Sequence, residues 1–145
     1  MKAKIEKYWP FTIALIIALP LSFHRSNISG FDEILQTTLL KSLNISGTLI
    51  GFFLTIFTII STIKTRRMQF IKEAGLFPRV NKYLVSVIVW HLVNISLILF
   101  FPVIESIGLP DWADLFSKGF LIFVVAFSWS LSIRFTSIFI KLLKE

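Results

Sequence analysis

Two ionisable side chains, His91 and Arg134, lie inside long apolar stretches of the sequence. Titratable groups at such positions are costly to place in hydrocarbon and are candidate functional sites. If each stretch is a helix, His91 lies about 12 Å from Tyr83 at one end of its stretch, and Arg134 lies about 13 Å from Leu143 at the matching end. The two side chains are therefore predicted at one depth in neighbouring antiparallel helices.

Amide and hydroxyl side chains extend this level into a predicted polar intramembrane cluster. Asn94 lies one helical turn from His91, and Ser130 and Ser137 lie one turn on either side of Arg134. Hydrogen bonds in such a cluster would reduce the cost of burying the cation. Alternatively, Arg134 extends to the headgroups, or it belongs to a basic ring around an anion-selective lumen. For His91, a hydrogen-bonded structural role is favoured over a proton relay.

Small and polar residues recur every three or four positions between Leu43 and Ile63, which places them on one helical face. Gly47 and Gly51 form a GxxxG pair that allows another helix to approach closely. Threonine hydroxyls can bond across helices or to their own backbone. This stripe predicts either packing inside one bundle or a seam or lumen between copies. Its members are Asn44, Gly47, Gly51, Thr55, Thr58 and Thr62.

The sequence contains no recognisable catalytic or metal-binding set. His24 and His91 are predicted at different levels and cannot meet, and no paired carboxylates lie within an apolar stretch. The chain has no cysteine, which excludes disulfides and thiolate metal sites. We therefore expect no enzyme activity, no metal and no cofactor.

The composition predicts that a lipid bilayer surrounds these residues. Of 145 residues, 55% are hydrophobic and 16% are charged, and the mean hydropathy is +0.81. A bilayer core of about 30 Å requires about 20 apolar residues in a helix. We predict an all-α polytopic membrane protein, with residues 1–145 forming one four-helix transmembrane bundle. The predicted spans are approximately 8–23, 43–63, 83–104 and 119–140.

Local signals bound the first two helices. A signal peptide is the competing interpretation of residues 8–23, but no cleavage site of the Ala-x-Ala type precedes Ser26. Asp32 and Glu33 suit the positive end of a helix dipole, so the second helix is predicted to begin near Phe31. It is expected to continue past the bilayer to about residue 74. Gly75 is the predicted break.

Basic residues predict the orientation, because lysine and arginine resist translocation. They gather in the amino-terminal tail, in residues 64–82 and at the carboxyl terminus, whereas the other two loops are neutral or acidic. This predicts a multi-pass protein of the bacterial inner membrane with both termini in the cytoplasm. A helical hairpin at 64–82 would form a cytosolic basic surface. Its residues are Lys64, Arg66, Arg67, Lys72, Arg79 and Lys82.

The net charge of +7 therefore points first to the lipid bilayer as partner. Anionic headgroups attract basic segments beside a membrane. An acidic cytosolic protein docking on the hairpin is the alternative, and a nucleic acid is not favoured.

The stretch LIGFFLTIFTIISTI, from Leu49 to Ile63, is followed by a basic helical extension, a break at Gly75 and a third span opening with KYL. In these features the chain resembles small four-span membrane subunits of bacterial phage-defence systems, such as Kiwa membrane subunits. The resemblance implies an oligomer that perturbs the membrane or holds a cytosolic partner. It implies no catalytic residues.

The leading hypothesis is thus a homo-oligomeric inner-membrane protein. It would act as a pore-like effector or a membrane-anchored sensor in antiviral defence, with the basic hairpin as docking surface. One alternative is a scaffold or assembly subunit whose stripe packs against a foreign helix. Another is a small-solute transporter that depends on His91 or Arg134. Small multidrug exporters have four similarly short helices but need a carboxylate in the first, and residues 8–23 contain none.

Overall fold

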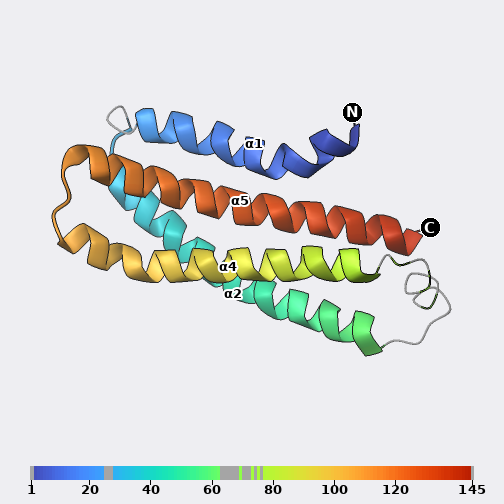
Figure 1. Ribbon diagram of the computed structural model, residues 1–145. Coiled ribbons are helices and arrows are strands. Elements are labelled where there is room, and N and C mark those ends of the chain that lie inside the picture. The colour runs from blue at the N-terminus through green and yellow to red at the C-terminus, as the bar shows by residue number, and fades with distance from the viewer. Residues whose placement is uncertain are drawn as a thin grey trace.

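The computed structural model describes residues 2–24, 28–62, 69, 73, 75 and 77–144. These residues form helices and the turns beside them, which confirms the predicted all-helical class (Figure 1). The helices are α1 (Lys2–Phe23), α2 (Phe31–Thr62), α4 (Phe77–Ser106) and α5 (Asp111–Lys144).

Three of these helices, α2, α4 and α5, are long and apolar enough to cross a membrane. Their length and composition indicate a membrane protein. The apolar part of α1, Tyr8–Phe23, is shorter than a standard span. At 1.5 Å per residue, that part extends about 24 Å.

Glycines with positive φ stand just before two helices. Gly30 has a φ of 67°, and α2 begins at the next residue, as predicted, with Asp32 and Glu33 in its first turn. Gly75 has a φ of 68°, a conformation that glycine adopts without steric cost. The predicted extension of α2 toward residue 74 lies mostly outside the described residues.

The helices pack as an antiparallel bundle in which α5 lies between α1 and α4 (Figure 1). The fourth helix, α2, packs on α4. Both chain ends lie at one end of the bundle, here called the terminal end (Figure 1). The connections from α1 to α2 and from α4 to α5 lie at the other, the loop end.

Two apolar clusters form the core. The cluster toward the terminal end contains Phe53, Ile56, Ile60, Val80, Leu84, Val87 and Phe135. The cluster toward the loop end contains Ala18, Leu35, Leu39, Ile98, Phe101, Leu121 and Ile122. Because Leu35 belongs to the second cluster, α2 packs against its neighbours well before the predicted span at residue 43.

Helix α1 approaches α5 closely through small residues. Ala14 is completely buried and Ala18 nearly so. A Cβ atom added at Gly119 would lie 2.6 Å from Ser22 Oγ, so a larger residue there would require Ser22 to move. Phe11 adds an edge-to-face contact with Phe123, with ring centroids 5.4 Å apart. Close approach of small residues and aromatic contacts thus hold the described side chains of α1 against α5.

Candidate functional site

A hydrogen-bonded network occupies the centre of the bundle. The imidazole of His91, on α4, is fully buried. Its Nδ1 atom lies 3.0 Å from Ser46 Oγ on α2, and its Nε2 atom lies 2.6 Å from Ser132 Oγ on α5. A neutral imidazole has one N–H donor and one acceptor nitrogen, so it can satisfy both serines at once. One side chain thereby bonds three helices together.

Asn94 extends the network along α4. Its Nδ2 atom donates to Ser42 Oγ at 3.1 Å and to Ser46 Oγ at 2.9 Å. Its carbonyl oxygen, Oδ1, is buried and accepts no hydrogen bond within the described part of the chain. On α5, Ser132 Oγ donates to the backbone oxygen of Ser128 at 3.0 Å. The resulting network lies between the two apolar clusters.

Arg134 does not join this network, which corrects the predicted grouping. Its Nη2 atom donates to the Tyr83 hydroxyl at 3.3 Å, and its Cζ atom lies 5.0 Å from the centre of the Tyr83 ring. Arg134 is two positions beyond Ser132, a rotation of about 200° around the helix. Arg134 and His91 were grouped because they were predicted at equal depth. Depth alone does not determine which face of α5 a side chain occupies.

The two predicted serines of α5 also lie apart from His91. Ser130 is buried but lies about 200° around α5 from Ser132. Ser137 is exposed, and its hydroxyl donates to the backbone oxygen of Ile133 at 2.8 Å. The serines that do contact the network, Ser42, Ser46 and Ser132, were not selected. The sequence feature that could have identified two of them is the four-residue spacing of Ser42 and Ser46 on the helix facing Asn94.

The Gly/Thr stripe of α2 faces away from the bundle. All six members, from Asn44 to Thr62, are exposed. A Cβ atom added at Gly47 or Gly51 would meet nothing within 4 Å. The stripe therefore does not pack against the other described helices of this chain, which favours the alternative prediction of a seam or lumen between copies.

The basic surface is described in part. Lys64, Arg66, Arg67 and Lys72 lie outside the described residues. Arg79 and Lys82 are exposed in the first turns of α4, at the same end of the bundle as the chain termini (Figure 1).

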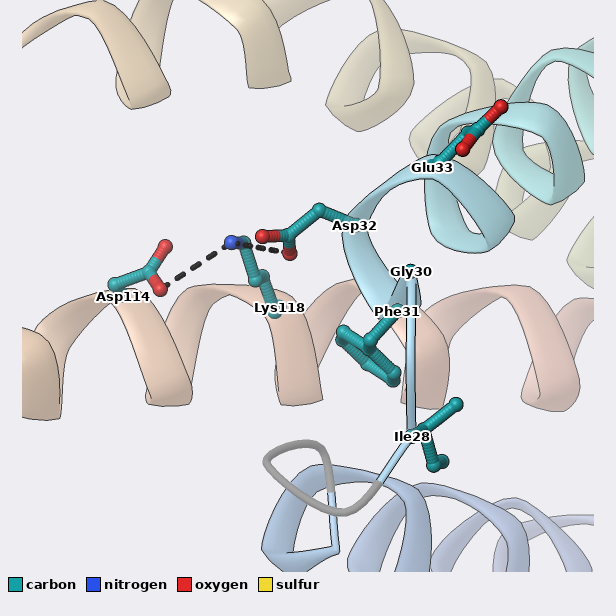
Figure 2. Close-up of a pocket in the computed structure, with 7 residues that line it drawn as sticks. All are labelled: Ile28, Gly30, Phe31, Asp32, Glu33, Asp114 and Lys118. Atoms are coloured by element: carbon teal, nitrogen blue, oxygen red, sulfur yellow. Dashed lines mark hydrogen bonds and ion pairs between the residues drawn. The ribbon is translucent and has the colours of Figure 1, made fainter.

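An ionic cluster lies at the loop end, where the sequence had indicated only loop charges. Lys118 on α5 is 8% exposed. Its Nζ atom lies 2.8 Å from Asp32 Oδ1, 3.3 Å from Asp114 Oδ2 and 3.8 Å from Glu105 Oε1. Figure 2 shows the ammonium between Asp32 of α2 and Asp114 of α5. One lysine thus joins the ends of α2, α4 and α5.

Lys118 immediately precedes the predicted 119–140 span and lies outside it. Burial alone would lower its pKa, but the hydrogen bonds and negative charges of Asp32 and Asp114 outweigh burial and raise the pKa above its ordinary value. While the carboxylates are charged, the ion pairs therefore stabilise the fold at pH values below that ordinary pKa. This contribution is lost as the pH rises through the raised pKa.

Comparison with known proteins adds no assignment: no protein-family model, no curated protein and no solved structure matches this chain. Among the described residues, no group of three or more histidine, aspartate or glutamate side chains could hold a metal ion. The arrangement provides helix-to-helix bonding at two levels, the buried network and the ionic cluster.

Replacing His91 by leucine should destabilise the bundle by about 1–3 kcal/mol, because Ser46 and Ser132 lose a buried partner. Unfolding of the purified protein in detergent, titrated with denaturant, measures this change. Ser137→Ala is the matched control, since that hydroxyl bonds only to its own helix, and it should change stability little. A double-mutant cycle of H91L with Ser132→Ala should give a non-zero coupling energy. Additive effects would contradict the bridging role.

Replacing Lys118 by methionine should lower the thermal stability in detergent at neutral pH. The three carboxylates would lose their shared cation and repel one another. Lys41→Met is the control, because Lys41 is an exposed lysine of α2. If both variants melt at the same temperature, the ionic cluster does not hold the loop end together.

Proposed function

We propose that this chain is a homo-oligomeric, multi-pass protein of the bacterial inner membrane that acts as a membrane-anchored sensor, with copies joined along the α2 stripe. Four spans and two cytoplasmic termini belong to the proposal. The observation that carries it is the orientation of the stripe, which faces directly away from the chain's own core.

Helical geometry makes this orientation clear. Exposed Gly47 and buried Ile56 are nine positions apart, or about two and a half turns, as are exposed Gly51 and buried Ile60. Each glycine therefore lies on the face opposite a core residue. Glycine costs a helix about 1 kcal/mol relative to alanine. Close packing against a second helix would offset that cost, as in other membrane helix pairs with small residues at their interface.

The stripe is suited to a dry seam. Thr55 Oγ1 donates to the backbone oxygen of Gly51 at 2.9 Å, Thr58 Oγ1 to that of Leu54 at 3.0 Å, and Thr62 Oγ1 to that of Thr58 at 2.7 Å. Because these hydroxyls already have acceptors on their own helix, the face needs no water to satisfy them. This favours a seam between copies over a water-filled lumen, and an anchored sensor over a pore-like effector.

The positions of the basic residues support the proposed orientation. Arg79 and Lys82 are exposed at the terminal end, whereas the carboxylates around Lys118 lie at the loop end. Basic segments are retained in the cytoplasm. The terminal end would therefore face the cytosol, and its basic surface would contact anionic headgroups or an acidic cytosolic partner. The resemblance to phage-defence membrane subunits suggests antiviral defence as the setting.

A scaffold subunit is the rival from another class, because the exposed stripe would equally accept a foreign helix. A small-solute transporter gains less support. His91 is fully buried and Arg134 is bound to Tyr83, so neither offers a transport pathway in this conformation.

Cysteine crosslinking tests the seam directly, since the chain has no native cysteine. Thr55→Cys should yield a disulfide-linked dimer when membranes are treated with a mild oxidant. Val89→Cys is the control, because Val89 is also exposed, on α4, and lies within a turn of the network level. Adding Gly51→Leu should reduce the T55C crosslink by separating the helices. Equal crosslinking of T55C and V89C would contradict the homo-oligomeric seam.

A measurement of ion flux distinguishes a membrane-anchored sensor from a pore-like effector. Proteoliposomes carrying the wild-type chain should release chloride no faster than protein-free liposomes, and Arg134→Leu should not change that rate. The physical reason is that Arg134 lies against Tyr83 and not on the α2 stripe. Chloride release that is fast in the wild type and lost in R134L would favour the pore-like effector instead.

A further inference from the structure

An apolar groove opens toward the loop end between α1 and α2, with α5 as its floor. Its volume is about 300 Å³. The walls include Ile17 and Leu21 of α1 and Leu35 and Thr38 of α2, and the floor includes Ala126 and Trp129 of α5. Since α1 packs on α5 while α2 packs on α4, the groove follows from the way the bundle is assembled.

A polar cavity of about 430 Å³ adjoins this groove. The two share Ile28 and Phe31 as lining residues. Figure 2 shows Phe31 and Ile28 below the pair formed by Asp32 and Lys118, on the way toward the end of α1. A single elongated ligand could therefore occupy both spaces, with one end polar and the other apolar. Both volumes lie within or near the range of small-molecule sites.

The charge of the polar cavity selects the kind of polar end. Among its described lining residues, Asp32, Glu33 and Asp114 carry negative charges and Lys118 carries a positive one. Two negative charges remain in excess. The side chain of Asp32 is 68% exposed even though one of its oxygens binds Lys118. A cationic group is therefore attracted, and an anionic one is repelled.

We propose that the cavity and groove together bind a phospholipid with a primary ammonium headgroup, phosphatidylethanolamine. Its ammonium donates hydrogen bonds to Asp32 in the polar cavity, and one acyl chain lies along α5 in the groove. Because the groove is almost wholly apolar and opens beside membrane-length helices, an acyl chain fits its chemistry. A bound lipid would join α1 and α2, which otherwise pack on different helices.

This site is distinct from the proposed seam between copies. The stripe residue Asn44 and the groove residue Leu35 are nine positions apart on α2, which places them on opposite faces. Loss of oligomerisation would thus leave lipid binding intact. Loss of lipid binding would leave the T55C crosslink intact.

Native mass spectrometry of the full chain in detergent tests the proposal. The protein is incubated with equal amounts of phosphatidylethanolamine and phosphatidylglycerol that have identical acyl chains. The expected result is preferential retention of phosphatidylethanolamine, by about tenfold, which corresponds to about 1.4 kcal/mol. Asp32→Asn should abolish most of this preference. Asp111→Asn makes the same charge change on α5 outside the cavity lining and should preserve it.

A second pair of variants tests the groove. Thr38→Trp places an indole in the wall of the groove and should reduce retention of both lipids. Thr12→Trp changes an exposed threonine of α1 that lies outside the groove lining, and it should have no effect. Circular dichroism confirms that each variant folds. Equal retention of the two lipids by the wild type, or equal retention by T38W and T12W, overturns the proposal.

Discussion

The hydrogen bonds of His91 to Ser46 and Ser132 are the constraint around which the bundle is organised. In hydrocarbon a polar side chain has no water to bond, so its partners must come from the protein. The imidazole meets this requirement because it has a bonding nitrogen on each side. Rotation or sliding of α2, α4 or α5 would separate at least one of these atom pairs. The network therefore specifies the register of three helices.

The two apolar clusters add packing contacts on either side of the polar network. One lies toward the terminal end and the other toward the loop end, and both pack side chains of α2, α4 and α5, with Ala18 of α1 joining the loop-end cluster. At the loop end, Lys118 adds a second polar tie between the same three helices. Apolar packing alone discriminates poorly between registers, because lipid tails solvate leucine as well as a neighbouring helix does. The polar ties supply this specificity.

Among the described residues, α1 contributes to neither the buried network nor the ionic cluster. It is held to α5 by small residues, close approach at Gly119 and aromatic contacts. The groove between α1 and α2 exists because those two helices pack on different partners. The outward face of α2, which carries the Gly/Thr stripe, is a second surface that no described helix of this chain covers. These two surfaces are available for contacts that the described helices of the chain do not make with one another.

The sequence alone determined the helical class, the beginning of α2 at Phe31 and the break at Gly75, because apolar length, capping and glycine φ are local properties. It also singled out His91 and Asn94, since polar groups in apolar helices are conspicuous. The partners of those groups depended on rotation about each helix axis, which local pattern does not define. Because their predicted depths are equal, the sequence grouped Arg134 with His91. In the structure Arg134 contacts Tyr83 instead, and three serines bond to His91 and Asn94. The tertiary structure also decided that the stripe faces outward and that Lys118 gathers carboxylates distant in sequence, because contacts between helices depend on how they pack.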